Sequence, residues 1–168
     1  MNQKLLVMPA CRLAAARFST AARVNLTPAL LALRNTRTTR CFDIPASKGT
    51  TFLEPDVYST PAMIWDMEWA VRETILEQLH NAGLEGWDSV GTSVTFEHTA
   101  ATPVGERVTL ELEVVAVGDD RPTVEASAVF SDAMGELGRG THRRMVADMQ
   151  RLQTRISERQ SKLRRTRS

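Results

Sequence analysis

The chain is organised around the segment Tyr58-Ser-Thr-Pro-Ala-Met-Ile-Trp-Asp-Met-Glu68-Trp-Ala-Val71, which begins the longest helix that the sequence predicts. Pro61 favours a helix start, because proline at the first helical position loses no hydrogen bond, and Ser59 and Thr60 precede it as candidate caps. The helix is expected to end near Asn81, before Gly83. Apolar side chains recur along it with a helical period: Ile64, Met67, Val71, Ile75 and Leu79.

One carboxylate, Glu68, lies among the apolar positions of this predicted helix. At about 100° per residue it falls about 40° from Ile64, whereas the other acidic residues of the helix project to the opposite side. Thr60 lies one turn before Ile64 on the same side. An unpaired buried carboxylate costs several kcal/mol, so a helix that retains one usually gives it a partner, a task or both. The alternative is a structural Glu satisfied by a buried arginine or by backbone amides.

Four strand-like runs follow the helix, at 90–98, 108–116, 124–130 and 136–149. Apolar side chains alternate with polar ones in most of them, as in strands with one buried face. The predicted fold class is therefore α+β, with a long helix packed on an antiparallel four-strand meander. A short strand over Thr50–Leu53 is also expected before the helix.

His98 is the second candidate site residue. It shares strand parity with its apolar neighbours, so it is expected to face the helix that carries Thr60 and Glu68. A hydroxyl, a carboxylate and an imidazole at one interface permit nucleophilic or general-base chemistry. A hydrogen-bonded core histidine is the alternative, and His80 and His142 are weaker candidates for the site.

The charged residues divide the chain into three segments. Residues 1–42 contain seven basic residues and no acidic one, whereas residues 43–150 contain seven basic and 19 acidic residues, a net charge of −12. The composition of the first segment predicts a disordered mitochondrial presequence and a mitochondrial matrix protein. A basic arm that binds nucleic acid or an acidic surface is the alternative.

Two positions in residues 1–42 are candidate processing points, Arg17-Phe18-Ser19 and Arg40-Cys41-Phe42. Both cysteines, Cys11 and Cys41, also lie there, so the remaining sequence has no cysteine for a disulfide or a metal site. We expect no cofactor and no metal. No apolar run approaches the roughly 20 residues of a transmembrane helix.

Residues 151–168 contain seven basic residues and one acidic residue, a net charge of +6, and are expected to form a basic helical tail. This tail is either a solvated extension or a surface for anionic lipid or RNA. No aromatic residue lies among its arginines, which disfavours stacking on RNA bases. Its rough apolar stripe comprises Met149, Leu152, Ile156 and Leu163.

Together these motifs resemble the hotdog-fold thioesterases of the fluoroacetyl-CoA thioesterase type. The similarity runs in order over about residues 50–150. It rests on Ser59-Thr60-Pro-Ala-Met with Met67-Glu68-Trp-Ala, Gly91-Thr92 with His98-Thr-Ala-Ala-Thr-Pro-Val-Gly105, and Gly138-Arg-Gly-Thr-His142-Arg-Arg144.

The resemblance implies a hotdog fold, in which an antiparallel sheet wraps a long helix and two copies form a homodimer. It also implies hydrolysis of an acyl-CoA thioester. The catalytic residues would be Thr60, Glu68 and His98, and the substrate-binding residues would be Gly91 and Arg144.

The chain departs from that family where the fluoroacetyl enzyme has an aromatic gate, since this region reads Leu53-Glu54-Pro55-Asp56. The expected substrate is therefore an ordinary short or medium acyl-CoA. A non-catalytic hotdog module, binding an acyl group or a larger mitochondrial assembly, would not need Glu68 and His98 together. A hotdog dehydratase or hydratase would use a different Asp/His arrangement, which the sequence lacks.

Overall fold

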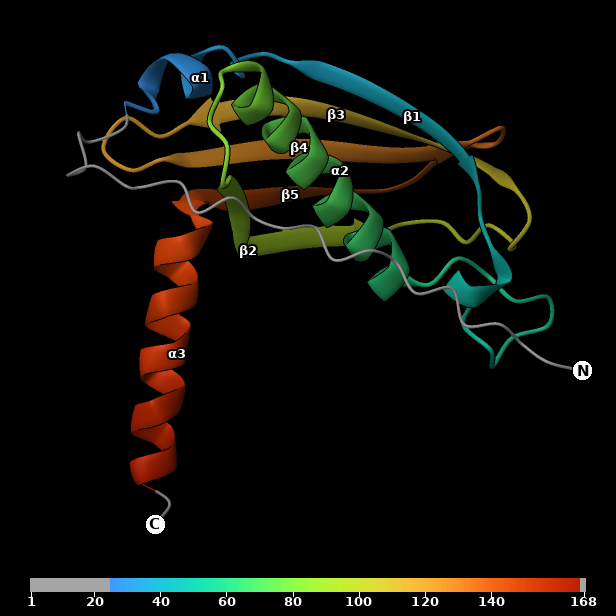
Figure 1. Cartoon of the computed structure of the whole chain (residues 1–168). Coiled ribbons are helices and arrows are strands. Elements are labelled where there is room, and N and C mark those ends of the chain that lie inside the picture. The colour runs from blue at the N-terminus through green and yellow to red at the C-terminus, as the bar shows by residue number, and fades with distance from the viewer. Residues whose placement is uncertain (1–24, 167–168) are drawn as a thin grey trace, which may run out of the picture.

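Helix α2 (Thr60–Asn81) crosses one face of a five-stranded antiparallel sheet (Figure 1). The structure is a computed structural model and describes residues 25–166. The strands are β1 (Arg37–Asp43), β2 (Trp87–His98), β3 (Arg107–Val117), β4 (Thr123–Asp132) and β5 (Gly135–Asp148). The other elements are α1 (Thr27–Leu31), the short 3-10 helix η1 (Ala46–Lys48) and α3 (Met149–Arg165). None of the helices in this part of the chain is long and apolar enough to cross a membrane.

Helix α2 begins and ends close to where the sequence predicts. Ser59 precedes it with extended backbone, although its side chain caps no backbone N–H. At the other end Gly83 has a φ of 69°. The Gly83 N–H donates to His80 O and the Leu84 N–H to Leu79 O, both at 2.9 Å. This pair of bonds closes the last turn and requires the left-handed backbone that glycine adopts without strain.

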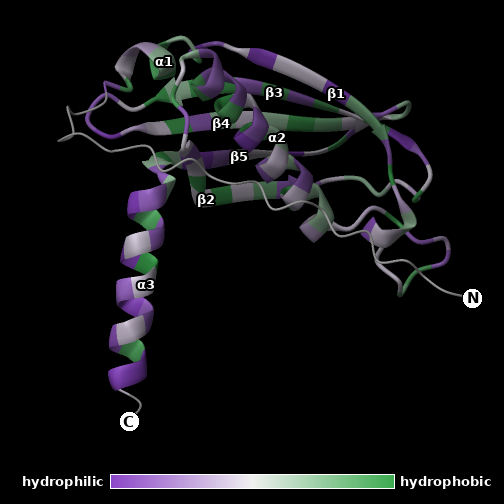
Figure 2. Ribbon diagram, viewed as in Figure 1, coloured by the Kyte–Doolittle hydropathy of each residue, from purple (hydrophilic) through white to green (hydrophobic). Residues whose placement is uncertain are grey.

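The core lies between α2 and the sheet. Figure 2 shows that hydrophobic residues recur along the strands that α2 covers. Met67, Val71 and Ile75 of the helix are buried, but Ile64 is only half-buried. The buried stripe is therefore rotated from the predicted one, and Glu68 lies at its edge with 37% of its side chain exposed. Glu68 is thus not the fully buried carboxylate that the helical pattern predicted.

The strand order is β1-β3-β4-β5-β2, so the predicted sequential meander is only partly correct. β3, β4 and β5 do form a meander. β2, however, pairs with β5 from Trp87↔Asp148 to His98↔Gly138, and not with β3. Alternating side chains fix which face of a strand is buried but not which strand is its neighbour. This order leaves β1 and β2 at the two edges of the sheet.

The assignment of residues 1–42 to a disordered presequence is wrong for the part that the structure describes. β1 pairs with β3 along its whole length, and Leu30 and Leu33 are buried in the core. The basic residues of this segment find acids on other elements, as Arg37 does with Glu113 at 2.9 Å. Residues 1–24 lie outside the described residues.

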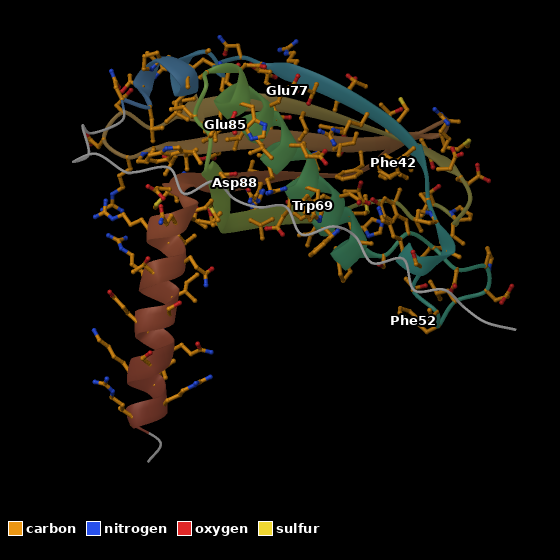
Figure 3. The ribbon with its side chains drawn as sticks, viewed as in Figure 1. Phe42, Phe52, Trp69, Glu77, Glu85 and Asp88 are labelled. Carbon is orange, nitrogen blue, oxygen red and sulfur yellow. The ribbon has the colours of Figure 1, made fainter. Side chains whose placement is uncertain are left out.

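The short strand expected over Thr50–Leu53 is also absent from the described chain. Thr51 has a φ of 62°, which interrupts extended backbone, and only isolated bridges join this loop to its neighbours. The segment is instead an exposed loop that leads into α2, with Phe52 at its surface (Figure 3).

Candidate active site

The first group of the site is a hydroxyl and an imidazole at the start of α2. Thr60 is the first residue of the helix, and its Oγ1 lies 2.8 Å from His98 Nδ1 at the end of β2. The other ring nitrogen, Nε2, lies 2.8 Å from the carbonyl oxygen of Ala100. Because a carbonyl only accepts, Nε2 donates to it, and in the neutral ring Nδ1 is left to accept the Thr60 proton. This is the arrangement of a nucleophile, a base and a group that orients the base.

The second group lies two helical turns further along α2. Glu68 Oε1 is 3.1 Å from Nε2 of His142, a residue of β5 that is 1% exposed. Gly91 of β2 closes the group, since a Cβ there would lie 3.0 Å from His142 Nε2 and 3.1 Å from Glu68 Oε1. A side chain larger than hydrogen at position 91 would therefore press on both.

His142 is neutral beside this carboxylate at physiological pH. Burial lowers its pKa, the nearby Arg144 guanidinium lowers it further, and Glu68 opposes both. Although the two atoms are close, neither ring nitrogen of His142 has a well-directed hydrogen bond among the described residues. The contact between Glu68 and His142 is thus a close approach of a carboxylate to an uncharged ring, not an ion pair.

Arg144 ties this group to the sheet. It is buried, and its guanidinium donates to Ser89 Oγ at 2.8 Å and to Ser89 O at 2.7 Å. A third, longer bond of 3.4 Å reaches the backbone oxygen of Glu68. Burial lowers the Arg144 pKa, but a guanidinium remains charged in proteins. Arg144 therefore holds a positive charge beneath the helical turn that carries Glu68.

A small cleft of about 170 Å³ opens beside Glu68, lined by Trp65, Glu68, Trp69, Arg72 and Arg144. The Trp65 and Trp69 rings meet edge to face at 5.8 Å, and both are exposed to solvent. Arg72 lies over the Trp69 ring and pairs with Asp88 on β2. Figure 3 labels Trp69 and Asp88 on their two elements. The cleft thus has an aromatic wall and a carboxylate at one end.

The structure brings the predicted site residues together in two groups rather than one. Thr60 and His98 form the first, and Glu68, Gly91 and Arg144 belong to the second. Within residues 25–166, Glu68 makes no hydrogen bond or ion pair to Thr60 or His98.

The imidazole nearest Glu68 is that of His142, which the sequence indicated only as a weaker candidate. The sequence feature that could have indicated His142 is its alternation with Gly140 and Arg144, which places the three residues on one face of the strand. In the part of the chain that the structure describes, no group of three or more His, Cys, Asp or Glu side chains is placed to hold a metal ion.

Comparison with known proteins gives one consistent family. Residues 43–150 match the family of the fluoroacetyl-CoA-specific thioesterase. The fluoroacetyl-CoA thioesterase of Streptantibioticus cattleyicolor is 34% identical over 104 residues, which is 62% of this chain and 70% of that protein. A crystal structure of a hot-dog-like protein from Thermanaerovibrio acidaminovorans has a TM-score of 0.70 at 24% identity, covers 81% of this chain and 97% of its own, and supports the fold alone.

A solved structure of a fluoroacetyl-CoA thioesterase has a TM-score of 0.63 at 28% identity and covers 74% of this chain and 95% of its own. The hotdog fold predicted from the sequence is therefore confirmed. With the family match extending over most of the folded domain, the chain belongs to the fluoroacetyl-CoA-specific thioesterase family and is a hotdog-fold thioester hydrolase.

Proposed function

We propose that this protein hydrolyses a short or medium acyl-CoA thioester, with Thr60, Glu68 and His98 as its catalytic residues. The observation that carries the proposal is the 2.8 Å contact between the Thr60 hydroxyl and His98, whose tautomer is set by the Ala100 carbonyl. Relatives named as fluoroacetyl-CoA thioesterases support an acyl-CoA as the substrate class.

Two routes to hydrolysis use these residues. In the first, Thr60 Oγ1 attacks the thioester carbon while His98 Nδ1 takes its proton. The C–S bond then breaks, coenzyme A leaves as a thiolate that takes up the proton, and water hydrolyses the acyl ester on Thr60. In the second, Glu68 either attacks the carbonyl, so that the C–S bond breaks, coenzyme A leaves as a thiolate and water hydrolyses the resulting anhydride, or removes a proton from an attacking water and passes it to the departing thiolate as the C–S bond breaks.

The remaining groups serve either route. In the first turn of α2, Pro61 has no N–H and the Met63 N–H donates to the Ser59 carbonyl at 3.0 Å. The N–H groups of Thr60 and Ala62, in contrast, donate no bond to the Ser59 side chain and are suited to stabilise the developing oxyanion. Gly91 allows the Glu68 carboxylate to lie close to the β2 backbone, where we propose that substrate binds, and the Arg144 charge favours negative charge there. Ile64 lies between Thr60 and Glu68 on the same edge of the helix, as an apolar contact for the acyl group.

The size of the cleft supports a small acyl group. At about 170 Å³ it is below the roughly 300–1,000 Å³ of a typical ligand pocket. The neighbouring β2 edge is open, and its residues from Gly91 to Thr95 are exposed. We propose that a second copy of the chain covers this edge and completes the site in a homodimer.

The test is release of free thiol from a series of acyl-CoA esters, from acetyl-CoA to palmitoyl-CoA. We expect kcat/KM to be highest for short or medium acyl groups and to fall steeply for the longest. Tight binding of several acyl-CoA esters without thiol release from any of them would favour the non-catalytic hotdog module instead.

We further propose that residues 1–24, with four basic residues and no acidic one, direct the protein to the mitochondrial matrix. Processing near Arg17-Phe18-Ser19 would leave the sheet intact, whereas processing near Arg40-Cys41-Phe42 would cut strand β1. Fusing residues 1–24 to a fluorescent reporter should place it in mitochondria. A cytosolic reporter, with the full chain also cytosolic, would contradict the proposal.

A further inference from the structure

Helix α3 carries an apolar stripe that the rest of the described chain covers only in part. It has no buried residue and projects away from the sheet (Figure 1). Met149, Ile156 and Leu163 are 36%, 52% and 48% exposed, and Leu152 is partly exposed. At 100° per residue these four side chains fall within an arc of about 60°. A stripe of this kind normally faces another apolar surface.

A row of cations runs along one side of the stripe: Arg151, Arg155, Arg159 and Lys162. Their side chains are exposed and make no hydrogen bond or ion pair to other residues within 25–166. The other side of the stripe carries uncharged polar residues such as Gln153, Ser157 and Gln160, with Arg164 near its end, and Glu158 is the helix's one acid. Figure 2 shows this mixture of hydropathies along α3.

The cations of the folded domain, in contrast, are mostly neutralised by acids beside them. Of the seven in residues 43–150, Arg144 is buried and five make ion pairs: Lys48–Asp66, Arg72–Asp88, Arg107–Asp43, Arg139–Glu136 and Arg143–Glu125. The same residues have a net charge of −12. A polyanionic surface is therefore repelled by the domain and attracted by α3.

We propose that α3 docks on an anionic lipid surface, with its apolar stripe in the acyl-chain boundary and its cation row among the lipid phosphates. A cationic helix with one apolar face lies in the membrane interface by this combination. At 1.5 Å per residue, its 17 residues extend about 25 Å along the surface. RNA would use the cations but would leave the apolar stripe uncovered, and α3 has no aromatic residue to stack on bases.

The test is co-flotation of the full chain with vesicles of phosphatidylcholine alone and with vesicles containing about one third phosphatidylglycerol. We expect binding only to the anionic vesicles, weakened by salt. Exchanging three cations, as Arg151→Gln, Arg155→Gln and Arg159→Gln, should lower the partition coefficient about 10²-fold, at about fivefold per cation. Ile156→Ser with Leu163→Ser should lower it at least about tenfold.

The matched control is Gln153→Ala with Ser157→Ala on the uncharged side of α3, which should bind as the unaltered chain does. Because α3 contributes nothing to the core, all these variants should keep the thermal stability and thiol-release rate of the unaltered chain in solution. Equal binding to neutral vesicles, or no binding, overturns the proposal. Binding that depends on the cations but not on Ile156 and Leu163 also overturns it, in favour of a polyanion such as RNA or an acidic protein.

Discussion

At the level of single residues, the contact between Thr60 and His98 predicts that turnover depends on both side chains. A positioned acid or base typically contributes about 10²–10⁴-fold to a rate. Thr60→Val, His98→Ala and Glu68→Gln should each lower kcat by at least about 10²-fold without changing the thermal unfolding midpoint by more than a few degrees. Steady-state thiol release from the best acyl-CoA measures the effect.

The matched controls for these variants are His80→Ala and Glu97→Gln, which change an imidazole and a carboxylate exposed to solvent. His142→Ala is not suitable, because this buried ring packs beside Glu68. Near-normal turnover of His98→Ala would show that the imidazole orients α2 without taking part in the reaction. Loss of turnover in Glu68→Gln alone would select the carboxylate route.

The neutral, buried ring of His142 links stability to pH. Its pKa in the folded protein is lower than the usual 6.5, chiefly because burial disfavours the charged form. Between 6.5 and that lower value the unfolded chain binds a proton that the folded chain does not. The free energy of unfolding should therefore fall as the pH drops through this window, and the contribution is fully present above it.

Urea unfolding at neutral pH and at about pH 5.5 measures this dependence. His142→Asn should remove this part of it, whereas His80→Asn, at an exposed position, should leave it unchanged. Identical pH dependence in His142→Asn and the unaltered chain would mean that His142 does not titrate differently in the folded and unfolded states.

At the level of elements, removal of β1 tests whether residues 25–42 belong to the folded domain. Deleting residues 1–24 should leave the free energy of unfolding unchanged. Deleting residues 1–42 removes Leu30, Leu33 and almost all of β1, and should cost at least about 3 kcal/mol through the two leucines alone. Denaturant unfolding compares the two proteins, and equal stability would place residues 25–42 outside the cooperative fold.

The helix and strands of the fold could be predicted because each has a clear period of apolar residues. β1 could not, since its sequence Arg37-Thr-Thr-Arg-Cys-Phe-Asp43 has no alternation of apolar and polar residues, and since it depends on partners distant in sequence, such as Glu113 for Arg37. The strand order could not be predicted either, because the alternation of buried and exposed residues along a strand does not show which strand it pairs with. Thr60 and His98 were found because the helical period and the strand parity place each on the apolar side of its element, whereas Arg143 and Arg144 made His142 read as part of a solvated, charged strand.

At the level of the whole molecule, the open β2 edge predicts self-association. An exposed edge strand offers unpaired backbone groups. The same edge of a second copy can pair with them when the two copies are related by a twofold axis. On β2 the apolar Val94 is 43% exposed and pairs with His142, the residue beside Glu68. Sedimentation at micromolar concentration should therefore show a dimer.

Val94→Lys should shift this equilibrium toward monomer, because it places a charge on each copy at the contact, and should lower turnover as the cleft loses its second wall. Val115→Lys is the matched control, since Val115 is 50% exposed on the interior strand β3, away from the edge. Only monomer in the unaltered protein, with full activity, would mean that one protomer holds the complete site. Dimers unaffected by Val94→Lys would move the contact to another surface of the molecule.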